Sequence, residues 1–186
     1  MPRLLTSLLS LGVALTLAGC STPAPAPTAT TDPTPTIAAS LIPTAPPSDV
    51  KDVDPAAFAG DFGDYTFRIG DGPTWCTINV DRKNVLCEQS EADAKYPPIP
   101  VPSSCEFSYG YQVQLFAETP TDGTKIADFV CSGGAYADPT NAGILNSGER
   151  VTLDGITCFV VGTAARCENE AKNYIVLGPD AWAIGD

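Results

Sequence analysis

The sequence predicts an all-β domain that is held together by disulfides and arranged as a small antiparallel meander, sandwich or barrel-like sheet. Short segments rich in β-branched and aromatic residues recur between clusters of Gly, Pro, Asn and Asp, a pattern typical of strands joined by tight turns. No window shows sustained helical periodicity. Six of the seven cysteines lie between Cys76 and Cys167, an even set that is typical of a disulfide-bonded exported domain.

The expected strands follow from residue alternation and from the turns between them. Residues 65–69 alternate as a half-buried strand does. The polar residues 81–84 have the length of a hairpin turn, and residues 119–123, with Pro120 and Gly123, indicate a second hairpin. We expect strands at residues 65–69, 75–80, 85–88, 109–118, 125–131, 149–153, 156–161, 165–168 and 173–177.

Two further segments are not expected to form strands. Residues 96–104 contain four prolines, which remove backbone donors, so we expect an extended segment that crosses the surface. Residues 179–184 begin with a proline and are expected to form one closing helical turn.

The N-terminal residues resemble a bacterial lipoprotein signal peptide, which we expect to span residues 1–19. Arg3 precedes the apolar stretch 4–17, which is shorter than the roughly 20 residues that a membrane-spanning helix needs. Leu17-Ala18-Gly19-Cys20 resembles the lipobox, in which the cysteine sulfur receives a diacylglycerol and the new amino terminus an acyl chain such as palmitate. Two such attachments anchor a protein durably. An ordinary secretory signal or an uncleaved hydrophobic anchor is the alternative.

Beyond the lipobox we expect a tether at residues 20–54 and one all-β domain at residues 55–186. The tether is rich in Pro, Thr and Ala and poor in aromatic residues, so it is expected to be disordered or extended. Its composition also resembles that of O-glycosylated stalks, although an unmodified spacer is sufficient to explain it and is the favoured interpretation. The predicted location is the extracytoplasmic face of the cell membrane, with the bilayer as a partner through acylated Cys20.

Fifteen pairings of the six domain cysteines are open, and hairpin geometry favours the sequential one. Cys76 pairs with Cys87, Cys105 with Cys131, and Cys158 with Cys167 in that pattern. The two outer units look alike, since in each a cysteine and an alternating strand lead through a turn to Cys-Glu. Zinc spacing and Cys-x-x-Cys redox spacing are both absent from the sequence, and so is histidine.

Several motifs around the cysteines occur together in this sequence. They are Phe67, Gly72, Trp75-Cys76, Phe129-Val130-Cys131-Ser132-Gly133, Gly155-Ile156-Thr157-Cys158, Ala165-Arg166-Cys167-Glu168-Asn169 and Tyr174-Ile175-Val176-Leu177. With the lipobox and the tether, these motifs resemble an uncharacterised domain family of actinobacterial secreted proteins and lipoproteins. The resemblance covers roughly residues 62–184, and it implies a small disulfide-bonded β domain outside the membrane with no assigned activity. The approach to the first cysteine, residues 72–75, departs from the family pattern.

Composition excludes several classes of chemistry. Without histidine there is no Ser-His-Asp or Cys-His catalysis, and no nucleotide-binding loop or Gly-x-Ser-x-Gly motif occurs. The sequence therefore favours a non-catalytic binding or scaffolding module, with no cofactor, metal or catalytic residue expected. A carboxylate-based hydrolase acting on envelope polysaccharide is the alternative.

Charge and aromatic residues indicate the kind of partner. Residues 55–186 contain 18 acidic and 8 basic side chains, a net charge of −10 that disfavours nucleic acid. Asp61, Asp64 and Asp71 raise the question of calcium, but without EF-hand spacing solvated turn acids explain them. The expected partner is a cell-wall glycan or an envelope protein; the oligomeric state is open. An exposed aromatic platform and ordinary core packing both remain open for Trp75, Tyr109, Tyr111, Tyr136 and Trp182.

Overall fold

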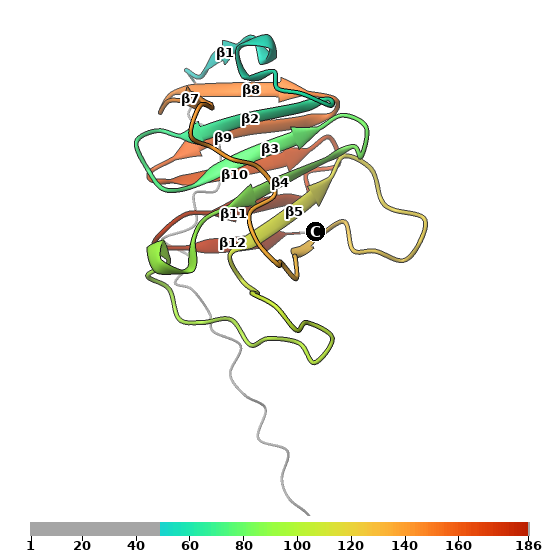
Figure 1. The fold of residues 1–186 in the computed structure, drawn as a ribbon. Helices are drawn as coiled ribbons and strands as arrows, with labels where there is room; N and C mark the ends of the chain where they lie inside the picture. The colour runs from blue at the N-terminus through green and yellow to red at the C-terminus, as the bar shows by residue number, and fades with distance from the viewer. Residues whose placement is uncertain (1–48, 186) are drawn as a thin grey trace, which may run out of the picture. The chain divides into compact units, whose positions relative to one another are not determined.

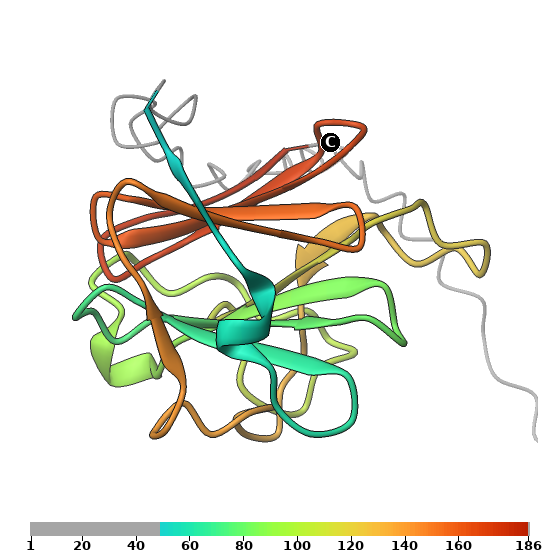
Figure 2. The same cartoon turned by 90° about the horizontal axis from the view of Figure 1, so that it is seen from above.

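The computed structural model describes residues 49–185, which fold into two six-stranded sheets (Figure 1). Figure 2 shows the sheets as two layers packed face to face. The predicted all-β class is confirmed, and the arrangement is a sandwich that does not close into a barrel. No described helix is long and apolar enough to cross a membrane. The predicted signal peptide, Cys20 and most of the predicted tether lie outside the described residues.

Sheet B contains a five-stranded antiparallel meander from the first half of the chain and a short parallel strand at one edge. Each meander strand pairs with the next one along the chain. The spatial order is β6 (Ala127–Phe129), β5 (Gln112–Phe116), β4 (Asn84–Glu88), β3 (Trp75–Asn79), β2 (Asp64–Ile69) and then the parallel strand β7 (Gly143–Leu145).

Sheet A has the same construction from the second half of the chain. The turn of its first hairpin, Asp154-Gly155, separates the strands expected at residues 149–153 and 156–161 and has positive φ at both residues (48° and 79°), as a type I′ turn requires. The spatial order is β1 (Lys51–Val53), which is parallel to its neighbour, and then β8 (Glu149–Leu153), β9 (Ile156–Val161), β10 (Ala164–Asn169), β11 (Tyr174–Leu177) and β12 (Trp182–Gly185).

The two halves of the chain exchange their leading strands. β1 precedes the meander of sheet B in sequence but pairs with β8 of sheet A, and β7 precedes the meander of sheet A but pairs with β2 of sheet B. In Figure 2 the orange chain before β8 runs from one layer to the other. The repeat suspected for the two cysteine hairpins therefore extends, as a topology, to six strands on each side.

One transverse row of core residues crosses each sheet through its cysteines. The partners in these rows are directly opposite one another on neighbouring strands, and all but Ile184 are buried. Rows like these form the sandwich core because alternate residues of a strand face the same side. The rows are Phe67, Cys76, Cys87, Val113 and Phe129 in sheet B, and Val151, Cys158, Cys167, Ile175 and Ile184 in sheet A.

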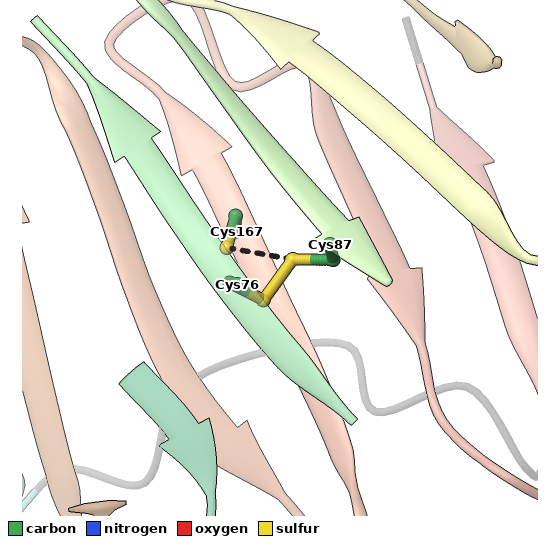
Figure 3. A group of neighbouring side chains, drawn as sticks. All are labelled: Cys76, Cys87 and Cys167. Carbon is green, nitrogen blue, oxygen red and sulfur yellow. Dashed lines mark hydrogen bonds between the residues drawn. A yellow bond between two sulfur atoms is a disulfide. The ribbon is translucent and has the colours of Figure 1, made fainter. Parts of the chain in front are cut away.

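The three predicted disulfides are formed in the structure. Cys76–Cys87 and Cys158–Cys167 each join directly opposed residues of a hairpin, with Cα atoms 4.0 Å apart. These two bonds meet in the core, where the Sγ atoms of Cys87 and Cys167 lie 3.7 Å apart (Figure 3). Both sulfurs are oxidised and carry no hydrogen, so this approach is a van der Waals contact between the sheets.

The third disulfide joins the long β4–β5 connection to the chain that follows β6. Cys105 and Cys131 are its ends, with Cα atoms 5.5 Å apart. Residues 96–104 contain no strand, as their prolines predict. The connection is also anchored by buried Tyr96, whose hydroxyl donates to Gly110 O at 2.8 Å and accepts from Gln89 Nε2 at 3.0 Å. Burial raises the pKa of Tyr96 to about 12.

Other elements differ from the sequence-based expectations. β1 lies within the segment assigned to the tether, so ordered structure begins before residue 55. The predicted helical turn at 179–184 is wrong, because residues 182–185 pair with β11 as a strand. β7 and the short 3₁₀ helices at Pro55–Phe58 and Glu91–Asp93 were not expected from sequence.

We predict that the two stacked disulfides are energetically coupled. Replacing Cys76/Cys87 or Cys158/Cys167 by Ala pairs is expected to cost about 3 kcal/mol each in loop entropy alone. Because the bonds touch, removing both is expected to deviate from additivity by about 0.5–3 kcal/mol in the free energy of unfolding, measured with urea.

The Cys105–Cys131 bond is the matched control, since neither of its sulfurs has a contact with the stacked pair within the described residues. Its removal, worth about 3.5 kcal/mol, is expected to add to the removal of either core bond. If the losses in the free energy of unfolding also add when both core disulfides are removed together, the predicted coupling is wrong.

Candidate binding site

The connections of the first half are much longer than those of the second, and they gather over one part of sheet B. The β4–β5 connection spans residues 89–111, whereas its counterpart between β10 and β11 spans residues 170–173. The chain after β6, residues 130–142, also lies over this sheet before it enters β7. The additional residues of these two connections therefore form walls over the outer face of sheet B, which the strand topology shared by the two sheets leaves uncovered.

The floor of this region is the outer face of β3, β4 and β5. Residues that alternate with the core positions point outward there, and the strand registers place them in three transverse rows. The rows are Trp75, Glu88 and Gln112; Thr77, Leu86 and Gln114; and Asn79, Asn84 and Phe116.

Two adjoining hollows, of about 220 and 260 Å³, lie over this floor, and together we call them the outer groove. They share Gln112, Ser132 and Gly134 as lining residues. The first hollow is lined in addition by Trp75, Glu88, Gln89, Ser90, Glu91, Ser108, Tyr111 and Ala135, and the second by Thr77, Asn79, Arg82, Asn84, Leu86, Gln114, Val130, Cys131, Gly133 and Tyr136.

Glu88 fixes one wall of the groove to its floor. Its side chain is 1% exposed, and its Oε1 accepts from Gln112 Nε2 at 2.6 Å and from the Tyr136 backbone N–H at 2.8 Å. Its Oε2 accepts from Trp75 Nε1 at 3.0 Å. Burial raises the pKa of the Glu88 carboxyl, although hydrogen bonds from the Tyr136 backbone, the Trp75 indole and the Ala137 backbone oppose the shift. The carboxylate therefore ties the loop at residue 136 to two neighbouring strands.

The equivalent residue of the other half is in a different environment. Glu168 lies in the same row position on β10 as Glu88 on β4, but it forms ion pairs with Lys172 at 3.0 Å and Arg166 at 3.8 Å. Among the described residues no ion pair involves Glu88, which has only neutral donors. A buried carboxylate held by neutral donors is thus a property of the groove rather than of the repeat.

Tyr136 is held over the second hollow by polar contacts. Its hydroxyl lies 3.2 Å from both carboxylate oxygens of Asp64, and the Arg82 guanidinium lies 5.3 Å from the centre of its ring. Asn79, which also contacts Asp64, is 3.4 Å from the same hydroxyl. The ring is 37% exposed, so an aromatic side chain stands fixed at the edge of the groove.

Several amide groups in the groove have hydrogen-bonding atoms without a partner within the described chain. Asn84 is only 9% exposed, yet its side-chain amide makes no hydrogen bond there, and the half-buried Gln114 makes none either. Gln112 donates to Glu88 and to Gly134 O, at 2.7 Å, but its Oε1 accepts nothing. None of these amide atoms is among the buried ones without a partner in the described residues, so solvent or a ligand can reach them.

The structure brings together three of the five aromatic residues that the sequence suggested as a platform. Trp75 and Tyr111 line the first hollow and Tyr136 the second. Tyr109 and Trp182 instead pack against Phe129, with ring centres 5.7 and 4.9 Å from it, and line neither hollow. The sequence interpretation missed Glu88 and the amides, which are signalled only by polar residues at alternate strand positions.

The acidic residues considered for calcium do not form a shared site. Asp64 contacts Tyr136 and Asn79, whereas Asp61 lines a separate hollow beside Gly143. In the part of the chain described, the three side chains placed closely enough for a metal are Cys76, Cys87 and Cys167, and all of them are in disulfides.

No protein-family model, curated protein or solved structure matches this chain. The resemblance to an actinobacterial domain family therefore stays a prediction from the motifs. The candidate site rests on its geometry alone.

We predict that Glu88 makes stability depend on pH. The pKa of the Glu88 carboxyl in the folded protein is raised above its ordinary value of 4.5. At a pH between the ordinary and the raised pKa, the unfolded chain therefore releases this proton more readily than the folded protein does. The contribution of Glu88 is therefore most favourable below about pH 4.5 and is lost as the pH rises through the folded pKa.

Urea unfolding at a series of pH values, for the wild type and Glu88→Gln, measures this effect. The stability of the wild type relative to the variant is expected to fall as the pH rises from 4 towards 8. A difference that stays constant over that range would show that Glu88 titrates as it does in the unfolded chain.

Proposed function

We propose that this chain is a membrane-anchored lipoprotein of the cell envelope, whose β domain binds an envelope component without catalysing a reaction. The observation that carries the proposal is the outer groove, in which amides without partners and fixed aromatic rings line a concave surface. Ligand sites of this kind are concave, largely preformed and supplied with a few oriented polar groups. The lipobox at Cys20 supplies the anchor, as its resemblance implies.

The construction of the groove supports a binding role. Its floor is three adjacent strands of a sheet, so the side chains on it are held in fixed positions. Its walls are pinned by the Cys105–Cys131 disulfide and by Glu88. A site that is already rigid loses little conformational entropy when a ligand binds. Three disulfides also suit an oxidising compartment outside the cytoplasm.

A carboxylate-based hydrolase is the second candidate, favoured by one observation. Glu88 and Glu91 line the same hollow, and burial raises the pKa of Glu88, as in a general acid. Both oxygens of Glu88 are, however, engaged by Trp75, Gln112 and the Tyr136 backbone. A general acid must present a free carboxyl oxygen to the substrate. The geometry therefore favours the structural role of Glu88, which ties the loop at residue 136 to the floor of the groove.

The anchor is tested by Cys20→Ala. The variant lacks the sulfur that receives the lipid, so the expected result is uncleaved precursor or protein released from the membrane fraction. Membrane fractionation with detection of the chain measures this outcome, and metabolic labelling with a palmitate analogue provides an independent readout. Mature, membrane-bound and acylated Cys20→Ala protein would contradict lipid attachment at this residue.

The binding role is tested by photo-crosslinking in live cells from Phe107. This residue is 64% exposed and lies beside the groove, since a Cβ at Gly133 would be 4.0 Å from its ring. A benzophenone amino acid at this position is expected to give a discrete adduct with an envelope glycan or protein. The control carries the same group at exposed Glu170, in a turn of sheet A, and is expected to give none. Equal labelling from both positions, or none from Phe107, would argue against a binding groove.

A further inference from the structure

We infer that the outer groove binds a neutral oligosaccharide, with its unpartnered amides on the sugar hydroxyls and its aromatic rings against the sugar faces. The inference rests on the proposed binding function and specifies its ligand class. It is drawn from the chemistry of the lining residues, taken in three steps: the amides, the rings and the charge.

Three amide side chains that have hydrogen-bonding atoms without a partner lie on two neighbouring strands. Gln112 and Gln114 are alternate residues of β5, so they face the same side about 7 Å apart. Asn84 lies on the adjacent strand opposite Phe116, so it is a diagonal neighbour of Gln114, about 7–8 Å away. An amide carries donors and an acceptor in one plane, and a hydroxyl is both donor and acceptor, so each amide can bond to neighbouring hydroxyls. The amide of Asn84 has no partner among the described residues and is not closed off from solvent, so such a ligand can reach it.

The aromatic rings suit the other surface of a sugar. One face of a pyranose ring presents C–H groups, which pack against the negative face of an aromatic ring. Trp75 and Tyr111 line the first hollow and Tyr136 lines the second, so each hollow combines an aromatic wall with polar groups. Each hollow is smaller than the roughly 300–1,000 Å³ of a drug-sized pocket, which fits individual sugar rings in adjoining subsites.

The charges in the groove favour an uncharged ligand. Arg82 is the basic residue among those that line the two hollows, and its guanidinium is already placed over the Tyr136 ring. A phosphorylated or sulfated ligand would lack the cluster of cations that such groups require. The carboxylate oxygens of Glu88 are occupied by hydrogen-bond donors, so they are not free for a cation. Glu91, the other carboxylate that lines the first hollow, is exposed to solvent, which screens its charge.

An extended peptide fits the groove less well. Peptides that bind β-sheets commonly add a strand at a free edge, where backbone groups are unpaired. β3, β4 and β5 each have a neighbouring strand on both sides, so the groove floor offers side chains only. A ligand recognised through hydroxyl groups needs nothing more than those side chains.

The test is an NMR titration of the disulfide-bonded domain with purified short neutral oligosaccharides of the gluco-, manno-, galacto- and arabino-series. At least one series is expected to bind saturably and to shift the side-chain amide signals of Asn84, Gln112 and Gln114 and the indole N–H of Trp75. Gln114→Ala is expected to weaken that binding about five- to tenfold, as the loss of hydrogen bonds predicts. Asn141→Ala, an amide truncation at an exposed site outside the groove, is the matched control and is expected to leave it unchanged.

Failure of the ligand class and failure of the binding function have different signatures. The oligosaccharide inference is overturned if no series binds, if the shifted signals lie outside the groove, or if Gln114→Ala and Asn141→Ala behave alike. If crosslinking from Phe107 then captures a protein, the binding function stands with a different ligand. If crosslinking also captures nothing, both are wrong.

Discussion

The contact between the Cys76–Cys87 and Cys158–Cys167 disulfides is the constraint on which the rest of this structure depends. Each bond joins two directly opposed residues, so it fixes the register of its hairpin. A slip of one residue would turn every core side chain of a strand to the outside, and the covalent bond prevents it. Because the two bonds touch at 3.7 Å, they also set where the middle of one sheet meets the middle of the other.

The two halves use the same scaffold for different purposes. Both consist of a leading strand and a five-stranded meander, and the exchange of leading strands joins them into one unit. The second half keeps short turns, whereas the first carries the long connections that form the outer groove. Glu88 and Glu168 illustrate the difference, since equivalent positions hold a loop in one sheet and form ion pairs in the other. The groove is thus formed by additional residues in the first half of the chain, whereas the second half keeps only the short turns of the shared topology.

Local patterns predicted much of this fold, and non-local pairing explains the misses. The meander strands follow from alternation and from turns such as Asp154-Gly155, and hairpin geometry gave the cysteine pairs. β1 and β7 are three residues long, and each pairs with a strand from the other half, which no local signal can show. The proline before β12 indicated a helical turn, but pairing with β11 decided otherwise. Composition found Trp75, Tyr111 and Tyr136, whereas the free amides look like ordinary solvent-facing strand residues until the walls of the groove are in place.

The exchanged strand β1 has a mechanical consequence. The chain enters the described domain through β1, which belongs to sheet A and is hydrogen-bonded in parallel to β8, with Lys51 N–H bonded to Gly148 O at 2.8 Å. The groove lies on sheet B. A pulling force between the N-terminal side and a ligand in the groove must therefore pass from sheet A to sheet B. The chain itself carries the force across, through residues 54–63 between β1 and β2, and the touching disulfides, which are not bonded to each other, add only a packing contact between the layers. Tension would then load the hydrogen bonds between β1 and β8 before it reached the strands beneath the groove.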